Sequence, residues 1–446
     1  MNRLARPAVW LAITIASLSL ALGAGPSGQE MPKPRPILIL GGTVFDAATA
    51  SARRNDAIVV QDGRIKAMGL EAVHRAPKDA RTIDASGRWI IPGLVDADVH
   101  LFETGGLDAA TDQAAAAAAS LRRAPAAFLR AYVCSGVTSV VNLGGPTWTF
   151  DLRSGRASDA LAPRIATSGP LLVLAGPAPV APGDDDPVWY LGDAEEAVRR
   201  VDQLAGLVPD LVAIRLEPWR DGDAPTLAAA VEAAHRRRLR VATRVGTSGA
   251  WRAAVEAGAD VVVGHIQEEL DTGLVQKMAT QRTTYVPALF ADVARRQVLE
   301  RRVVFEPFER GCSPTASLES FDRVPPPQPP SAPAPGGTSA PTNLGRLVEA
   351  GVTIAAGSNA GDIRVLPGSS LHRELELMVE AGLSPPQALL SATRVGARLM
   401  GREGELGQLR KGMLADLVLL DADPLADIRN TRHIVAVIRG GALYER

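Results

Sequence analysis

This 446-residue sequence has only two cysteines and a net charge close to zero. The first feature bears on lipid anchoring and disulfides, and the second on charged partners. The two cysteines, Cys134 and Cys312, lie far from the N-terminus, which argues against a bacterial lipid anchor. Cys134 stands in an apolar stretch that enters a strand, so we expect a buried thiol rather than half of a disulfide. The net charge of −1 gives no electrostatic reason to expect a nucleic-acid or membrane-surface partner.

Lysine is also scarce, because only five of the 48 basic residues are lysines. None lies between Lys78 and Lys277, a stretch of the chain that is rich in arginine. Any site that needs a lysine within that stretch is therefore excluded.

The one long apolar run lies at the N-terminus. Arg3 and Arg6 precede the run Val9–Leu22, and small residues follow it. This order is typical of a secretory signal peptide, which we predict over residues 1–25, with an exported protein, periplasmic or secreted, and no membrane association after cleavage. The alternative is an uncleaved anchor, although a spanning helix needs roughly 20 apolar residues.

The two ends of the remaining chain share a β-rich character. Residues 36–90 contain alternating apolar and polar positions and the hairpin dipeptide Asp62-Gly63. Short β-rich runs return in residues 405–446. We therefore predict that both ends join in one small β-sandwich domain.

The middle of the chain, residues 91–404, alternates strands with helical patterns. Eight such units over about 300 residues indicate a (β/α)8 TIM-type barrel, with an open doubly wound sheet as the alternative. The eight predicted strands are Val95–His100, Thr138–Leu143, Arg164–Gly169, Leu211–Leu216, Arg240–Val245, Val261–Ile266, Thr283–Leu289 and Thr353–Ser358.

A proline-rich segment, residues 325–341, follows the seventh predicted strand. Loops after barrel strands lie on the face that carries the active site. The segment is then either a solvated insertion or a cover over the barrel mouth.

Several motifs together resemble the metal-dependent amidohydrolase superfamily, in its imidazolonepropionase-like and prolidase-like branch. The strand-one segment IPGLVDADVH, residues 91–100, is similar to the family pattern PGL-(I/V)-D-x-H-x-H. Val261–His265 resembles the family's sixth strand and Gly351–Gly361 its eighth. The tail from Gly407 to Gly441 matches the family most closely, and the resemblance covers roughly residues 36–446.

The resemblance implies metal-dependent hydrolysis of carbon–nitrogen bonds other than peptide bonds. In the family, one or two ions, usually zinc, are held by the His-x-His pair, a carboxylated lysine on strand four, histidines on strands five and six, and an aspartate on strand eight. The ion lowers the pKa of a bound water, and the aspartate takes the proton of that water.

This sequence departs from that pattern at most of the metal-binding positions. Asp98 replaces the first histidine of the strand-one pair, and Arg215 stands where the lysine is expected. Arginine does not ligate metals, since it keeps its proton. The remaining positions are Arg244 for the strand-five histidine, Asn359 for the aspartate, and the retained histidines His100 and His265.

Three hypotheses follow. The first is a catalytically degenerate protein with a ligand-binding or vestigial role, no cofactor, and a small-molecule ligand at the barrel mouth, in which Asp98 pairs with Arg215 or Arg244. The second is an active hydrolase with a single metal at Asp98, His100 and His265. The third is metal-free catalysis by Arg215, Arg244 and Asp98. His372 and Glu374, at the start of the last barrel helix, are interpreted as structural.

Overall fold

The computed structural model describes residues 35–107, 114–154, 161–174, 185–264, 268–323 and 339–446. All of these residues belong to one compact unit, Pro34–Arg446. The predicted signal peptide, His265 and most of the proline-rich segment lie outside the described residues. Among the helices of the described residues, none is long and apolar enough to cross a membrane.

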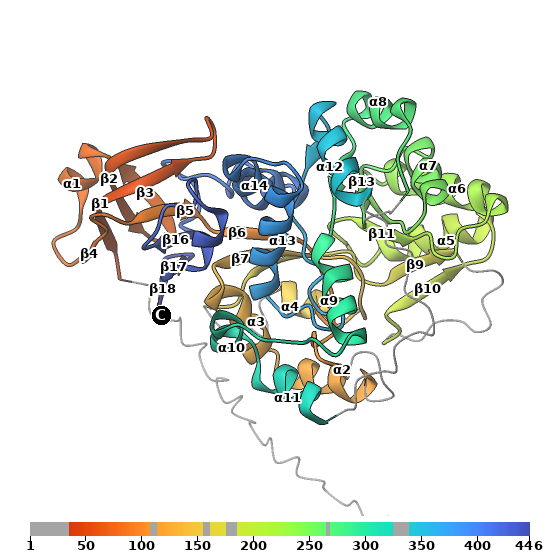
Figure 1. The fold of residues 1–446 in the computed structure, drawn as a ribbon, viewed down its shortest axis with the longest axis horizontal. Helices are drawn as coiled ribbons and strands as arrows, with labels where there is room; N and C mark the ends of the chain where they lie inside the picture. The colour runs from red at the N-terminus through yellow and green to blue at the C-terminus, as the bar shows by residue number, and fades with distance from the viewer. Residues whose placement is uncertain (1–34, 108–113, 155–160, 175–184, 265–267, 324–338) are drawn as a thin grey trace, which may run out of the picture. The chain divides into compact units, whose positions relative to one another are not determined.

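Strands from both ends of the chain form one β domain, as predicted (Figure 1). Within it, β5 pairs antiparallel with β16, so that Pro92 lies opposite Leu417. Asp62 and Gly63 both have positive φ angles in the β2–β3 hairpin, which favours the residues found there. The hydrogen-bonded order is β18-β17-β16-β5-β1-β2-β3, with β4 beside β1; the strands are β1 (Ile37–Asp46), β2 (Ser51–Gln61), β3 (Arg64–Met68), β4 (Arg81–Asp84), β5 (Trp89–Pro92), β16 (Leu417–Leu420), β17 (Ile434–Arg439) and β18 (Ala442–Glu445).

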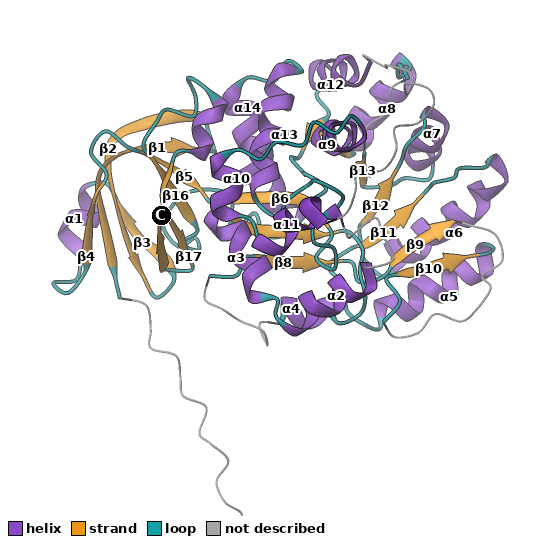
Figure 2. Cartoon of the chain, turned by 60° about the horizontal axis from the view of Figure 1, so that its bottom comes forward, coloured by secondary structure: helices purple, strands orange, loops and turns teal. Residues whose placement is uncertain are grey.

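The central segment forms parallel strands that alternate with helices, as in a TIM-type barrel (Figure 2). The ladders of the described residues form two sheets, β6-β7-β8 and β10-β9-β11-β12-β13-β14-β15, rather than one closed ring. Ala97 donates a backbone hydrogen bond to Ala356, which links β6 to the end of the second sheet. The strands are β6 (Leu94–Val99), β7 (Val137–Asn142), β8 (Arg164–Thr167), β9 (Leu171–Leu174), β10 (Val188–Leu191), β11 (Val212–Arg215), β12 (Val241–Arg244), β13 (Val261–Val263), β14 (Thr284–Val286) and β15 (Thr353–Ile354).

Each of the eight predicted barrel strands overlaps an observed one, but β9 and β10 were not predicted. The barrel strands are short and largely buried, which explains their near-continuous apolar sequences. In β11 and β12, Ala213 and Ala242 pack in a different apolar cluster from Ile214 and Val241, as the two-residue period of a strand requires.

Helices follow the barrel strands and cover them. Several begin at a side chain that accepts a backbone N–H, for example Asp193 before α5 and Thr247 before α7. The helices are α1 (Leu70–Arg75), α2 (Ala114–Arg123), α3 (Ala126–Cys134), α4 (Thr149–Arg153), α5 (Ala194–Ala205), α6 (Ala224–Arg236), α7 (Ser248–Glu256), α8 (Thr272–Gln281), α9 (Leu289–Leu299), α10 (Pro307–Cys312), α11 (Thr315–Arg323), α12 (Ser339–Glu349), α13 (Ser369–Glu380), α14 (Pro385–Leu390) and α15 (Gly396–Leu399), with short turns η2 (Asp221–Asp223), η3 (Ser391–Val395) and η4 (Ile428–Arg432).

The prediction for Cys134 is wrong, because Cys134 forms a disulfide with Cys312. The two Cα atoms lie 5.5 Å apart although the residues are separated by 178 positions. The segment after α9 returns to the first barrel helix, so that α10 packs beside α3 (Figures 1 and 2). An apolar surrounding is equally compatible with a buried thiol and with a buried disulfide. The pairing depends on the path of the segment after α9, which brings Cys312 to Cys134.

Candidate functional site

A cavity of about 700 Å³ lies at the carboxyl ends of the parallel strands. This is the face on which TIM-type barrels build their active sites. One part of the lining is apolar and comes from Phe102, Leu171, Pro187, Val188, Val245, Ala288 and Ala291. The charged or titratable lining residues are His100, Glu103, Arg215, Glu217, Arg244, Glu268, Asp292, Arg295 and Asp362.

Asp98 and Arg244 form an ion pair at the base of this cavity. Arg244 Nη2 lies 2.6 Å from Asp98 Oδ1 and 2.8 Å from Oδ2, so one nitrogen serves both carboxylate oxygens. The Asp98 side chain is fully buried, whereas that of Arg244 keeps 19% of its surface exposed. The sequence predicted that Asp98 pairs with one of two arginines, and the structure selects Arg244.

His100 lies directly beside this ion pair. Its Nε2 is 2.8 Å from Asn359 Oδ1 and 3.2 Å from Arg244 Nη2. The two contacts require opposite roles of Nε2: it accepts if Arg244 Nη2 donates to it, and it donates if it bonds to the Asn359 oxygen, so the tautomer of His100 selects between them. The amide of Asn359 in turn donates to Asp362 Oδ2 at 3.1 Å, and Asp362 pairs with Arg295.

Arg215 stands next to Arg244 but forms no ion pair with any of the described residues. The two are register partners at the ends of β11 and β12, and both line the cavity. Arg215 Nε is buried without a hydrogen-bond partner. Within the described part of the chain, no carboxylate lies within ion-pair distance of Arg215, whereas Arg244 and Arg295 each have one.

Two buried carboxyl groups hold the backbone around the cavity. Asp96 accepts hydrogen bonds from the backbone N–H of Ser358 and from its hydroxyl, which positions the turn that carries Asn359. Glu374 accepts from Leu289 and Phe290 at the start of α9. Burial raises the pKa of Asp96 to about 7 and that of Glu374 to about 8.

Sequence reasoning missed several charged residues of the cavity. Burial also raises the pKa of Glu103, which lines the cavity three residues after His100. Glu217 packs over Gly246, where any Cβ would collide with its carboxylate. Asp362 could have been found, because it directly follows the Gly351–Gly361 motif that contains Asn359, but Arg295 and Asp292 lie on a helix that carries no motif.

The described residues do not fit a zinc ion in the manner of the predicted site. No group of three or more His, Cys, Asp or Glu side chains is placed to hold a metal in the portions of the chain that the structure describes. Both oxygens of Asp98 are engaged by a guanidinium, and His100 Nε2 faces the Asn359 oxygen. Arg244 keeps its proton, so its fixed positive charge would repel a divalent metal ion at this distance. The predicted ligand His265 lies outside the described residues.

Comparison with known proteins identifies the family. The family model described as "Amidohydrolase family" matches residues 89–443, which is most of the chain. This protein belongs to the amidohydrolase family. Membership confirms the resemblance found in the motifs of strand one and of the tail.

The relatives of this amidohydrolase-family protein match it over short stretches in sequence, whereas the similar solved structures cover more than nine-tenths of its length. Imidazolonepropionase of Rubrobacter xylanophilus is 36% identical over 105 residues, which is 22% of this chain and 24% of that protein. The structure of a Bifidobacterium longum protein described as a prolidase covers 93% of this chain and 96% of its own, with 25% identity and a TM-score of 0.71. The structure of Aspergillus niger ochratoxinase covers 93% of this chain and 96% of its own, with 21% identity and a TM-score of 0.68, which shows a shared fold.

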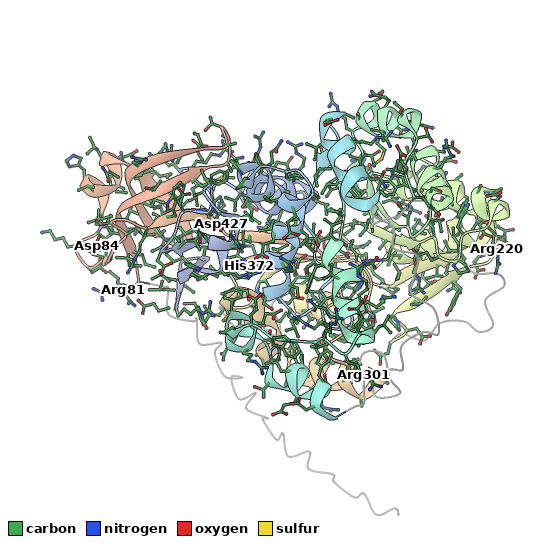
Figure 3. All side chains as sticks on the ribbon, in the orientation of Figure 1. Arg81, Asp84, Arg220, Arg301, His372 and Asp427 are labelled. Carbon is green, nitrogen blue, oxygen red and sulfur yellow. A yellow bond between two sulfur atoms is a disulfide. The ribbon has the colours of Figure 1, made fainter. Side chains whose placement is uncertain are left out.

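His372 lies away from the cavity, in the core of this amidohydrolase-family fold, on α13 (Figure 3). Its Nε2 is 2.8 Å from the Ser135 carbonyl, and Nδ1 is 2.9 Å from the Thr431 hydroxyl. Burial lowers its pKa to about 3, so the ring is neutral at pH 7. A neutral ring donates from Nε2 to Ser135, while Nδ1 and the Ile428 carbonyl, 2.8 Å from the Thr431 hydroxyl, share the single hydrogen of that hydroxyl. His372 therefore joins α13, the end of α3 and η4.

We expect His372 to contribute to acid sensitivity. In the unfolded chain it binds a proton below about pH 6.5, but in the folded protein only near pH 3, so stability is lost as pH falls through this window. His372→Gln keeps a donor and an acceptor but does not titrate. The fall in the urea midpoint between pH 7 and pH 5 should be smaller in this variant than in the wild type. His74→Gln, at an exposed position, is the control; equal slopes in all three proteins would contradict the assignment.

Proposed function

We propose that this amidohydrolase-family protein does not carry out the metal-dependent hydrolysis of its family, and that its barrel mouth binds a small molecule without a cofactor. One observation carries the proposal: a single nitrogen of Arg244 contacts both oxygens of Asp98 and lies beside His100 Nε2. An arginine side chain thus takes the electrostatic role that a metal ion has in the family. The cavity of about 700 Å³ has the size of a small-molecule site.

The residue expected to accept a proton is also changed. Asn359 stands at the position of the family's aspartate, and its amide is held between His100 and Asp362. An amide cannot act as a general base, since it has no accessible protonation at neutral pH. This supports a binding role rather than hydrolysis by the family's route.

Metal analysis tests the proposal directly. Protein purified without chelator, and then incubated with zinc and desalted, is expected to retain well under one equivalent of zinc per chain. His265→Ala is the matched variant, because it removes the retained histidine that completes the alternative single-metal site. One tightly held equivalent in the wild type that is lost in His265→Ala would overturn the proposal in favour of a single-metal hydrolase.

We also propose that the protein is exported, to the periplasm or beyond the cell. The order of residues 1–25 supports this, and so does the Cys134–Cys312 disulfide, since disulfides persist in oxidising compartments. The intact mass of protein recovered from outside the cytoplasm tests it, because a mass that still includes Met1 contradicts cleavage.

A further inference from the structure

Arg215 is exceptional among the cavity arginines because no carboxylate of the described residues forms an ion pair with it, although the charge of Glu103 acts on it from a greater distance. Arg244 is paired with Asp98 and Arg295 with Asp362, at 2.6 Å and 3.1 Å. Arg215 has no such partner among the described residues, and its Nε is buried without an acceptor. A partly buried guanidinium without a counter-charge is unfavourable unless something else supplies the charge.

The neighbourhood of Arg215 is arranged to receive an anion. Arg215 and Arg244 are side by side in the register of β11 and β12, so their guanidinium groups extend from the same edge of the sheet. Arg244 uses only Nη2 toward Asp98 and lines the cavity with the rest of its group. Two adjacent guanidinium forks match a carboxylate, which accepts paired hydrogen bonds.

The rest of the lining limits the charge and the body of the ligand. Glu103, Glu217 and Glu268 also line the cavity, and their carboxyl groups would oppose a ligand with more than one negative charge. Phe102, Leu171 and Val188 provide an apolar wall. A singly charged ligand with an apolar body meets both conditions.

We infer that the barrel mouth binds a small monocarboxylate with an apolar body, and that Arg215 is the residue that binds its carboxylate. This inference rests on the proposed function and specifies its ligand class. The carboxylate would supply the direct ion pair that Arg215 does not form with any described residue, with Arg244 as its second donor, while the apolar wall covers the body.

Three probes of matched shape test the ligand class in full-length protein at pH 8 by calorimetry. Phenylacetate is a monoanion, phenylacetamide is its neutral counterpart, and benzylphosphonate carries a second charge. We expect phenylacetate to bind wild-type protein at least tenfold more tightly than either of the others. Equal binding of the amide, tighter binding of the phosphonate, or no binding of phenylacetate would overturn the inference.

Variants test the residue. Arg215→Met should weaken phenylacetate binding at least tenfold, and should raise the Tm of the ligand-free protein because it removes a partly buried charge that forms no ion pair with the described residues. Arg199→Met is the control, an arginine that does not line the cavity and is paired with Glu195, and should change binding by less than threefold. Should Arg215→Met not fold, Arg215→Lys keeps the charge but not the fork and should still weaken binding severalfold. Wild-type affinity in both Arg215 variants would overturn the assignment.

These outcomes separate the inference from the function on which it rests. If the protein retains no zinc and does not bind phenylacetate, the proposed function is still supported and only the inferred ligand class is wrong. A stoichiometric zinc ion removes the proposed function, whatever phenylacetate does.

Discussion

Asp98→Asn is expected to lower the free energy of unfolding by about 3 kcal/mol, because it leaves the Arg244 guanidinium without its carboxylate. The asparagine amide also places a donor where Arg244 Nη2 needs an acceptor. The value is at the low end of the range for broken buried pairs, since Arg244 keeps part of its surface in solvent. Urea unfolding of both proteins at neutral pH measures the loss.

A double-mutant cycle isolates the pair. The double variant Asp98→Asn/Arg244→Leu should be much more stable than the sum of the two single losses predicts, because both charges are gone and no unpaired charge stays buried. Arg215→Leu is the matched control, since Arg215 is the register partner of Arg244 but does not contact Asp98. Additive losses for Asp98 and Arg244, or equal recovery with Arg215→Leu, would contradict the ion-pair assignment.

Removing the disulfide is expected to lower the free energy of unfolding by an amount similar to that expected for Asp98→Asn. In the double variant Cys134→Ala/Cys312→Ala, the unfolded chain regains the freedom of a loop that spans 178 residues. The chain-entropy relation places the upper limit near 5 kcal/mol, and native disulfides cost about 2–5 kcal/mol when removed. Urea unfolding without reductant measures the difference.

Reductant provides the control for this prediction. Dithiothreitol should destabilise the wild type by nearly the same amount and leave the double-alanine variant unchanged, which separates loss of the cross-link from loss of packing at the two buried sites. Two titratable thiols in unreduced, unfolded wild-type protein would show that the disulfide does not form.

Much of the architecture can be predicted from local sequence. Alternation of apolar and polar residues identified the terminal strands, and buried apolar runs between helical patterns identified the eight barrel strands. These signals are strong because periodicity reports burial on one face or both. The dipeptide Asp62-Gly63 predicted the hairpin because these two residue types readily adopt the positive φ angles of a tight turn. β9 and β10 were missed because their runs, of four residues each, lie in a stretch without a clear period.

The positions of the candidate site could also be read from the sequence. Motif order placed Asp98, His100, Arg215, Arg244 and Asn359 at the ends of barrel strands, and such ends converge in a parallel barrel. The structure brings Asp98, His100, Arg244 and Asn359 into contact and puts Arg215 beside them. Family membership itself rests on those motifs and on the match over residues 89–443.

Only the tertiary structure decided which groups pair. Asp98 could meet either arginine on sequence grounds, and the packing of the barrel brought it to Arg244, whereas Arg215 has no ion-pair partner within the described part of the chain. Cys134 and Cys312 meet because the insertion after α9 packs against α3, a path that no local pattern encodes. Residue type and strand ends follow from neighbours in the chain, whereas pairings between groups more than a hundred residues apart depend on how the whole barrel packs.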